Sequence, residues 1–521
     1  MQNSINPIQL EIIWTRLVSA VDEAAATFVR ASFSSLVREA NDFAVVLTDA
    51  EGRSLAQSSK SIPSFIGTLP ASIKHFRRKF PPHTLREGDV LFTNDPWMGS
   101  GHIHDVTLAM PIFRNGELIA FAGITSHMPD IGGRLRSTGI RELYEEGLQI
   151  PMLKLMEGGV TNEAIVAFIR QNVRVPDATM GDIWGQVAAC HKCAARLSDL
   201  LDESDVDLKS VADEIISRSD AAMRAAIRAV PDGTYRYTIV HDGFEERIII
   251  NSNVTVSGDR IHIDYTGTSP QLPRAVNVVP IYTFAYTAYG VKALLCPDVP
   301  NNEGSFQPVT TSAPEGTVLN PRFPAASGAR GMIGHLLPVA LMGALSDVLP
   351  DRVWAPGSAN SGMSISGEHA GKRYAGIYFI NAGQGASSRR DGLSALSFPS
   401  NLSNTPIEVI EGEVPLRVVH RKLRRGSGGA GAHRGGDGLD FAVEFVGDKP
   451  AVCAVIMTRF RVPPPGLNGG EPGLVGKILL NSEPVDPVEH LVLKPGDLIS
   501  MQTAGGGGFG APCTRSSRFK V

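Results

Sequence analysis

Two short segments of this sequence carry side chains that could bind a metal ion. The segments are NDPWMGSGHIHD at residues 94–105, with Asp95, His102, His104 and Asp105, and SHMPD at residues 126–130, with His127 and Asp130. Imidazole nitrogens together with carboxylate oxygens suit Mn, Fe or Zn, whereas a structural zinc site usually contains cysteine, which both segments lack. The segments predict a divalent-metal site, provided that the fold brings them together.

A β-hairpin between the two segments would bring them together. Residues 106–113 and 117–127 are rich in β-forming side chains and flank Asn115-Gly116, the dipeptide most typical of a two-residue turn. If these two residues form the turn, Arg114 faces Glu117 and the pairing continues in step along both arms. The resulting pairs at the open end are His104 with His127, Asp105 with Ser126, and His102 with Pro129.

The register decides which side chains share the face of His127. In an unbroken ladder His102, His104 and His127 point to one face and Asp105 points away. Pro111 cannot donate to the ladder and is typical of an edge or a bulge, and a bulge would shift the register by one residue. A bend at the open end, or a loop that begins before residue 105, would instead group His102, Asp105 and His127. Both ligand sets remain open at this point.

The order of motifs along the chain resembles that of a known family. Residues 94–105 resemble the Asn-Asp-Pro-aromatic-x-Gly-Gly-x-His-x-x-Asp signature of the hydantoinase B/5-oxoprolinase family, which includes N-methylhydantoinase B-type subunits and the acetone carboxylase alpha subunit. The other similar stretches, in the same order, are VREANDFAVVLTDAEGR (37–53), SHMPDIGG (126–133), EEGLQIP (145–151), CPDVPNNEG (296–304), RRGSGGAGAHRGGDGL (424–439) and TAGGGGFG (503–510). The resemblance extends from about residue 5 to residue 512.

The resemblance implies a metal-binding subunit of an ATP-dependent hydrolase of cyclic amides such as hydantoins, 5-oxoproline or lactams. In such complexes a hydantoinase A-type partner binds ATP and phosphorylates a carbonyl oxygen of the substrate, so a hetero-oligomer is expected. The positions that match the family's metal ligands are His102, Asp105, His127 and Asp130, which favours Asp105 over His104. The chain departs from the family at Phe65, where many relatives have His.

The same resemblance leaves two alternative functions. One is an alpha subunit of the acetone or acetophenone carboxylase type, in which activated bicarbonate meets a phosphorylated enol at the same metal. The other is a noncatalytic scaffold that stabilises the partner subunit. A bicarbonate requirement separates the carboxylase from the hydrolase, and full activity without the histidine ligands would indicate the scaffold.

Other carboxylates near the motifs have two interpretations each. Asp95 could steer or deprotonate the attacking water, or it could form an Asx-type turn before Pro96. Glu39, Asp42 and Glu146 could add carboxylates near the metal, but a solvated helix end is the expected position for each of them.

Three further patterns are expected to have no chemical role. The glycine runs at residues 428–438 and 505–510 are expected to form tight turns between strands. Cys190 and Cys193 have CxxC spacing without a second such pair, which favours a structural role. GLVGKI at residues 473–478 lacks the spacing and the hydroxyl residue of a phosphate-binding loop, so the nucleotide site is expected in the partner.

Composition favours a protein of the cytoplasm that binds small molecules and other proteins. The 49 Lys and Arg nearly balance the 53 Asp and Glu, so neither a nucleic acid nor a membrane surface is an expected partner. The N-terminus lacks a signal-like pattern, and no window of about 18 residues is apolar throughout. The five cysteines, sparse for this length, suit a reducing compartment.

The periodicity of apolar residues predicts an α+β fold, large and multilayered, with antiparallel hairpins and meanders plus helical segments. The expected elements are a helix at 8–32, two strands within 43–57, helices over 161–229, a meander at 235–267, helices over 277–350, and strands with turns from about 405 onward. Three regions are expected: an N-terminal α/β region with the metal-site hairpin (1–205), a meander and helical region (206–400), and a Gly-rich β region (401–521).

Overall fold

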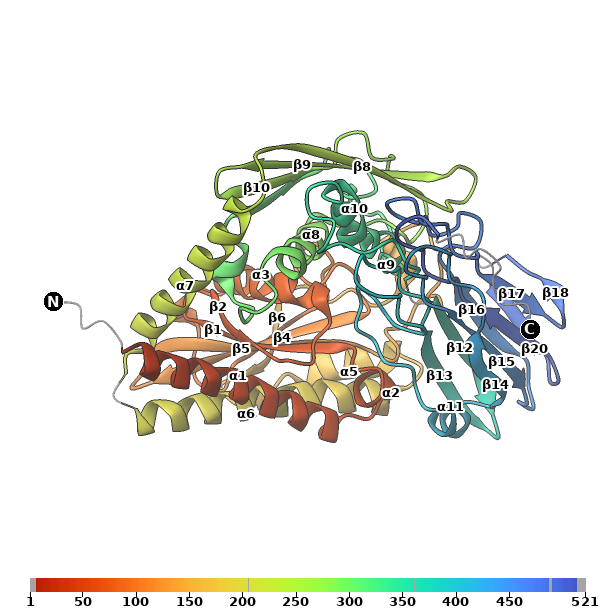
Figure 1. Cartoon of the computed structure of the whole chain (residues 1–521). Helices are drawn as coiled ribbons and strands as arrows, with labels where there is room; N and C mark the ends of the chain where they lie inside the picture. The colour runs from red at the N-terminus through yellow and green to blue at the C-terminus, as the bar shows by residue number, and fades with distance from the viewer. Residues whose placement is uncertain (1–5, 205, 360, 487–489, 513–521) are drawn as a thin grey trace, which may run out of the picture.

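The structure is a computed structural model that describes residues 6–204, 206–359, 361–486 and 490–512. Helices and sheets alternate in layers (Figure 1), which confirms the expected α+β class. The N-terminal part is built on a seven-stranded antiparallel sheet with the order β2-β1-β5-β4-β3-β6-β7. Its strands are β1 (Phe43–Asp49), β2 (Ser54–Gln57), β3 (Val90–Thr93), β4 (Asp105–Arg114), β5 (Glu117–His127), β6 (Leu153–Glu157) and β7 (Val160–Thr161).

Helices cover both faces of this sheet. On one face α1 (Pro7–Ala31) packs against α6 (Pro176–Glu203), and the helix predicted at residues 8–32 is confirmed. On the other face lies α3 (Pro63–Lys79), with α8 (Pro280–Leu295) behind it (Figure 1). Because apolar helices lie on both sides, every residue of β1 is buried, and β1 reads as a continuous apolar run rather than an alternating one.

A second sheet forms the opposite edge of the molecule from α1 and α6. It has four strands in the order β11-β10-β9-β8, and its antiparallel strands β8 to β10 confirm the meander predicted at residues 235–267. The strands are β8 (Gly233–His241), β9 (Ile248–Ser257), β10 (Arg260–Asp264) and β11 (Val309–Ser312). Helix α10 (Leu336–Ala344) lies between this sheet and α8, and α7 (Leu208–Arg228) joins the two layers (Figure 1).

The stretch 277–350 is less helical than the sequence predicts. Between the end of α8 and residue 330 the chain forms only the short turn η2 (Glu303–Phe306) and strand β11. Prolines recur from Pro297 to Pro324. A proline lacks a backbone N–H and keeps the preceding residue out of the helical region, so a long helix cannot form there.

The C-terminal part consists of two further sheets. Their orders are β13-β12-β16-β19 and β14-β15-β20-β17-β18. The strands are β12 (Ser361–His369), β13 (Lys372–Ile380), β14 (Leu416–Arg424), β15 (Gly438–Phe445), β16 (Ala451–Ile456), β17 (Lys477–Leu480), β18 (Glu483–Pro484), β19 (His490–Leu493) and β20 (Leu498–Gln502). The strands predicted from about residue 405 are confirmed, whereas β12, with the sequence SGMSISGEH, lacks the β-branched pattern that would predict it.

The remaining helical elements are short. They are α2 (Ser35–Arg38), α4 (Leu143–Glu146), α5 (Glu163–Asn172), α9 (Gly331–Gly334), α11 (Ile407–Glu413) and η1 (Pro82–Thr84). Together α5, α6 and α7 account for the helices predicted over residues 161–229. The predicted boundaries near residues 205 and 400 stay a prediction.

The glycine runs near the C-terminus pack backbone against backbone instead of forming tight turns. A Cβ atom at Gly506 would lie 1.9 Å from the carbonyl oxygen of Gln384, and one at Gly428 would lie 1.8 Å from that of Gly435. Neither glycine has a positive φ, so close approach rather than a turn conformation requires glycine there. Gly506 donates its N–H to Gly436 O at 2.9 Å and accepts from Gly429 N at 2.8 Å.

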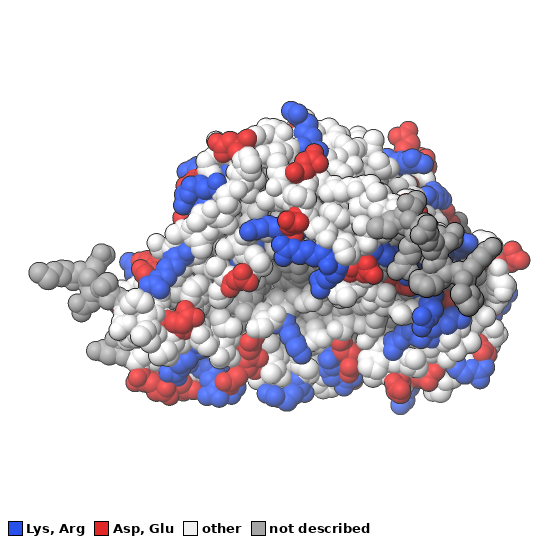
Figure 2. Space-filling view, viewed as in Figure 1, with Lys and Arg blue, Asp and Glu red and all other residues white. Residues whose placement is uncertain are grey.

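The face of the molecule shown in Figure 2 carries both signs of charge, in agreement with the balanced composition. Within the described ranges, no helix combines the length and the apolar character that crossing a bilayer requires. Cys190 and Cys193 are buried and free on α6, and burial raises the pKa of both thiols, which agrees with a structural role.

Candidate metal centre

The predicted hairpin is present, but its register changes along its length. Asn115 and Gly116 form the turn with φ values of 53° and 81°, and Arg114 faces Glu117 as predicted. Between the pairs Phe113 with Leu118 and Ile112 with Ala120, Ile119 is left without a partner. This bulge shifts all later pairs by one residue.

Because of the bulge, Asp105 rather than His104 lies opposite His127. The predicted pairs of His104 with His127, Asp105 with Ser126 and His102 with Pro129 are therefore wrong at the open end. Directly opposed residues of an antiparallel pair share a face of the sheet. The carboxylate of Asp105 and the imidazole of His127 consequently project to the same side.

His102 reaches the same side from a loop, because β4 begins only at Asp105. Asn94 fixes the base of this loop: its amide donates to Ile103 O at 2.8 Å and to Leu148 O at 2.9 Å, and its oxygen accepts from Ile150 N at 2.6 Å. Gly101 has a φ of 103°, and a Cβ there would lie 2.8 Å from Nε of Arg330. Glycine at this position thus lets the loop close over that arginine.

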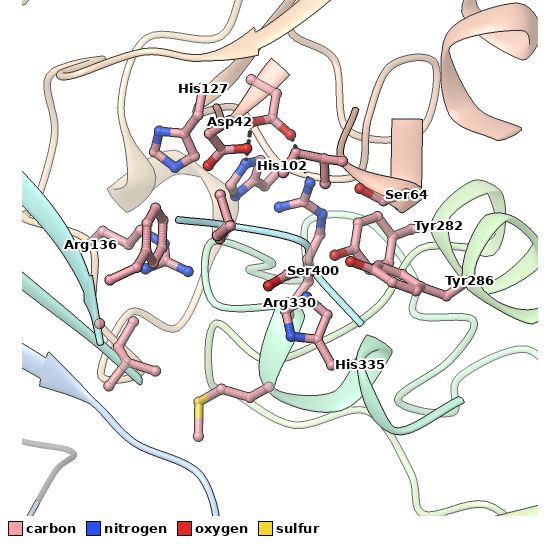
Figure 3. A pocket seen from close by; sticks show the side chains of 18 of the residues that line it. Asp42, Ser64, His102, His127, Arg136, Tyr282, Tyr286, Arg330, His335 and Ser400 are labelled. Carbon is pink, nitrogen blue, oxygen red and sulfur yellow. Dashed lines mark hydrogen bonds and ion pairs between the residues drawn. The ribbon is translucent and has the colours of Figure 1, made fainter. Parts of the chain in front are cut away.

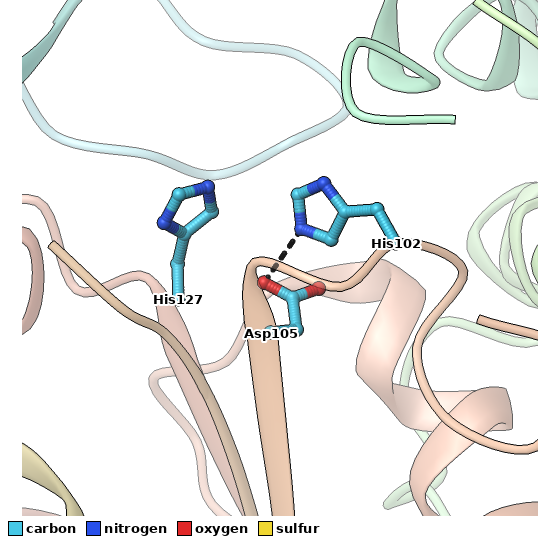
Figure 4. Close-up of side chains that lie close together, drawn as sticks. All are labelled: His102, Asp105 and His127. Carbon is cyan, nitrogen blue, oxygen red and sulfur yellow. Dashed lines mark ion pairs between the residues drawn. The ribbon is translucent and has the colours of Figure 1, made fainter. Parts of the chain in front are cut away.

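Three potential metal-ligand atoms lie close together at the open end of the hairpin. His102, Asp105 and His127 supply one each, and the three atoms are all within 4.8 Å of one another (Figure 4). His102 Nε2 lies 2.8 Å from Asp105 Oδ1. All three side chains are buried; His127 Nε2 has no partner, and His102 Nε2 and Asp105 Oδ1 have no partner other than each other. Buried polar atoms without partners are costly, so atoms that gather in this way indicate a missing ligand.

The second nitrogen of each imidazole shows what that ligand must be. His102 Nδ1 lies 3.2 Å from Gly328 O, and His127 Nδ1 lies 2.9 Å from Met128 O. A carbonyl oxygen only accepts, so Nδ1 carries the proton in both rings and Nε2 carries a lone pair. Burial lowers the pKa of both imidazoles well below the usual range, which keeps them neutral. Two lone pairs and a carboxylate oxygen facing one point fit a cation.

Two imidazoles and one carboxylate suit Mn, Fe or Zn and leave coordination positions for water or substrate. The second oxygen of Asp105 is already engaged, because Oδ2 accepts from Ser100 Oγ at 2.6 Å and from Arg330 Nη2 at 2.7 Å. Arg330 in turn lies 4.2 Å from the centre of the Tyr282 ring. Asp105 is thereby held with only Oδ1 directed toward the cation position.

The ligand atoms line a cavity of about 60 Å³ between the N-terminal sheet, α8, α9 and β12 (Figure 3). Its other polar lining side chains are Asp42, Ser64, Arg136, Tyr282, Tyr286, Arg330, His335, Ser361 and Ser400. One water needs roughly 10–15 Å³ measured in this way, so the cavity holds a small group and a few waters.

Asp42 and Glu146 are buried beside this centre and not at the solvated helix ends that the sequence suggests. Burial, together with the Asp105 carboxylate, raises the pKa of Asp42 to about 8. Burial also raises the pKa of Glu146 to about 7, although its Oε1 accepts from Ser327 N and Gly328 N, both at 2.6 Å. Glu39 is partly exposed and does not line the cavity.

The structure does not bring Asp130, Asp95 or His104 into the ligand set. Asp130 Oδ1 accepts from Arg174 Nη1 at 2.6 Å and from Gly132 N at 3.3 Å, so its carboxylate is engaged in a loop contact. Asp95 Oδ1 accepts from Trp97 N at 2.9 Å and Met98 N at 3.2 Å, which is the Asx-type turn, and it lines a separate cavity. His104 is buried with its ring 5.5 Å from that of His127.

Sequence reasoning missed the residues that come from distant segments, chiefly Arg136, Arg330, Tyr282 and His335. Arg330 stands among small residues in AASGARGM (325–332), and an arginine in such a run is a usable signal. Arg136 follows the second histidine segment in a loop of glycines and arginines, where nothing distinguishes it from its neighbour Arg134. Only the folded structure shows that Arg136 lines the cavity and that Arg134 does not.

Comparison with known proteins identifies similar chains along the whole length. The family model described as hydantoinase B/oxoprolinase matches residues 6–512. A putative D-/L-hydantoinase subunit of the B type from Pseudomonas sp. (strain NS671) is 31% identical, over 98% of this chain and 91% of its own.

Two solved structures share the fold. The crystal structure of ATP-dependent caprolactamase from Pseudomonas jessenii has a TM-score of 0.90 and 29% identity, and covers 99% of this chain and 93% of its own. A nucleotide-free structure of acetone carboxylase has a TM-score of 0.91 at 21% identity, over 98% of this chain and 76% of its own. At 21% identity, the similarity to acetone carboxylase shows only that the two chains share a fold.

Proposed function

This chain belongs to the hydantoinase B/oxoprolinase family, and from that premise we propose that it is the metal-binding subunit of an ATP-dependent cyclic-amide hydrolase. Hydantoins and caprolactam, which the names of its relatives contain, are both cyclic amides. The observation that carries the proposal is the convergence of His102 Nε2, Asp105 Oδ1 and His127 Nε2, all buried and without a partner outside this group.

The partner in this proposal is a hydantoinase A-type subunit that binds ATP and phosphorylates the amide oxygen. The relative from Pseudomonas sp. is named as one of the subunits of a hydantoinase, which implies a second kind of subunit. The sequence of this chain contains no phosphate-binding loop motif. The free cysteines among the described residues suit a complex of the cytoplasm. The expected assembly is a hetero-oligomer.

In the mechanism, His102, Asp105 and His127 hold a divalent Mn, Fe or Zn ion. Such an ion lowers the pKa of a bound water toward neutrality and polarises a substrate oxygen. The carbonyl groups of Gly328 and Met128 keep the imidazole protons on Nδ1, so both Nε2 atoms stay available. Arg330 holds Oδ2 of Asp105 and thereby orients Oδ1.

Asp42 is the proton acceptor in this proposal, because its carboxyl group lines the same cavity as the three ligands (Figure 3). A carboxylate oxygen of Asp42 takes the proton of the attacking water, and the ring carbon–nitrogen bond then breaks as the nitrogen takes up a proton. This leaves an acyl phosphate, which a second water cleaves to the ring-opened carboxylate and inorganic phosphate. Glu146 is a positioning residue: it binds Ser327 N and Gly328 N and so fixes the carbonyl group that orients His102.

The test is metal content and ring-opening activity of the complex assembled with its ATP-binding partner. His102→Ala and His127→Ala are expected to lose the metal and to lower activity on the order of 10³-fold, because a Lewis-acid ion supplies several kcal/mol. His83→Ala, at an exposed position, is the control. Full activity of the ligand variants in an intact complex would indicate a scaffold, and a bicarbonate requirement without ring opening would indicate a carboxylase.

A further inference from the structure

The cavity that contains the metal ligands also contains unused hydrogen-bond donors. Arg136 donates from Nε to Gly328 O at 2.9 Å, but its two terminal nitrogens have no hydrogen-bonding or ion-pair partner among the described residues. Nearby, Ser361 Oγ is buried without a partner, and so is His335 Nδ1. Arg330 differs, since Asp105 and Ser100 O already engage it. The free donors of Arg136 therefore face the cavity with no protein group to bind.

The charges around the cavity require an anion once the metal site is filled. A divalent ion and the guanidinium groups of Arg136 and Arg330 carry four positive charges. The carboxylates of Asp42, Asp105 and Glu146 carry three negative charges even when all three are ionised. The two ligand histidines add no charge, because each would hold the ion through Nε2 and keep its proton on Nδ1 against a carbonyl oxygen. An unbalanced buried positive charge is costly, so the cavity is complementary to an anionic group.

The donors suit a tetrahedral oxyanion. A guanidinium group presents two parallel N–H donors to a phosphate or a carboxylate, and a phosphoryl group offers further oxygens to other donors from other directions. Ser361 approaches from β12 and Arg136 from the loop after β5, so their donors come from different segments. The volume of about 60 Å³ admits a group of phosphoryl size beside an ion.

We propose that Arg136, with Ser361 beside it, binds the phosphoryl group of an activated substrate in the same cavity as the three metal ligands. The protein then receives its substrate as a phosphorylated intermediate and holds it by the group that the partner has added. This inference rests on the proposed function, because that function supplies the phosphoryl group. Arg136 is a substrate-binding residue in this scheme, whereas Arg330 is a positioning residue for Asp105.

The test measures inorganic phosphate binding to the full chain loaded with Mn²⁺, by calorimetric titration and by broadening of the phosphorus NMR signal by the ion. Arg136→Gln is expected to weaken phosphate binding on the order of 30-fold or more with the metal retained, and Arg136→Lys less than Arg136→Gln. Arg134→Gln is the matched control, because Arg134 lies two positions away and pairs with Glu145 on the surface. Its phosphate affinity is expected to equal that of the unchanged chain.

Three results would overturn the inference: no phosphate binding by the metal-loaded chain, equal phosphate affinity in Arg136→Gln, or acetate binding as tightly as phosphate, which would indicate a carboxylate receptor. Failure of the proposed function gives a different result, namely a chain that binds no metal. In that case calorimetry still decides whether phosphate binding depends on Arg136, and its dependence or independence supports or overturns the inference.

Discussion

Two buried clusters in this molecule contain the same residue types and differ in what their atoms face. One is the metal centre with His102, Asp105 and Arg330. The other, which we call the junction cluster, consists of His241 at the end of β8, Asp242 directly after it, and Arg459. All six side chains are buried, and only the first cluster has a group of ligand atoms that meet at one point within the described residues.

In the junction cluster the backbone satisfies the Asp242 carboxylate, whereas Arg459 Nε, Arg459 Nη2 and His241 Nε2 are buried without a hydrogen-bonding partner. Asp242 Oδ1 accepts from Arg461 N at 2.8 Å and from Val462 N at 2.6 Å, while Oδ2 accepts from Phe460 N at 3.2 Å. Arg459 donates from Nη1 to Val240 O at 2.9 Å. These bonds join the end of β8 to the loop after β16, so the junction cluster holds two sheets together.

The histidines of the two clusters are in opposite tautomers. In the metal centre, Nδ1 of His102 and of His127 faces a carbonyl oxygen, which leaves a lone pair on Nε2. In the junction cluster, His241 Nδ1 accepts from Gly243 N at 3.2 Å, so its proton lies on Nε2, which then cannot bind a metal. Of the two clusters, only the first has imidazoles whose Nδ1 faces an acceptor and whose Nε2 is therefore free to bind a cation.

The largest expected effect that separates the clusters is on stability. Asp242→Asn replaces one acceptor oxygen with an amide that faces backbone N–H groups and removes the charge beside Arg459, so it should lower the free energy of unfolding by about 2–4 kcal/mol. Metal content should stay unchanged. Urea denaturation of the metal-loaded chain measures the effect, with the exposed Asp202→Asn as the control. Loss of metal in Asp242→Asn would contradict the view that the junction cluster has no part in metal binding.

Removing the metal should have the next largest effect, and only through the first cluster. A chelator should lower the stability of the unchanged chain by about 2.7 kcal/mol relative to metal at a hundred times its Kd, because only the folded state binds the ion. His102→Ala should show no such change, and His241→Ala should respond as the unchanged chain does. Thermal unfolding with and without chelator measures the three chains. A chelator response in His102→Ala would contradict the assigned ligand set.

The smallest effect concerns the pH dependence of stability. Burial lowers the pKa of His241 from 6.5 to about 4. Between these two pH values His241 is protonated in the unfolded chain and neutral in the folded chain. The stabilising contribution is complete above pH 6.5 and is lost as the pH falls toward 4. His241→Gln should flatten the stability profile in that window, and denaturation at several pH values tests this. An unchanged slope would show that burial does not lower the pKa of His241 relative to the unfolded chain.

The sequence alone could predict the parts of the metal centre that depend on local structure. Asn115-Gly116 determines the turn, and the two β-rich arms place His127 opposite the end of the first segment. The family resemblance favours Asp105, and the geometry gathers Asp105 with His102 and His127. Asp130 resembles a fourth ligand in the motif, but its pairing with Arg174 depends on a contact that the motif does not contain.

The parts that could not be predicted depend on packing between distant segments. The bulge lies at Ile119, in a run of apolar residues where no residue type marks it, although Pro111 on the other arm is a hint. Arg136 donates to the carbonyl oxygen of Gly328, and Arg330 follows Gly328 by two residues. Gly328 is 226 positions from His102 in the sequence. No periodicity relates such positions, and nothing local in the sequence indicates that Asp42 and Glu146 are buried.

The glycine-packed C-terminal region constrains the order in which the chain can fold. Residues 503–510 supply hydrogen bonds to Pro356, Gly436, Leu467 and Glu471, which precede them in the chain. Until this last run leaves the ribosome, those earlier backbone groups have no final partner. Long-range pairing of this kind is slow and leaves unpaired edges exposed. A nascent chain should therefore depend on chaperone protection until residues 503–510 have emerged from the ribosome.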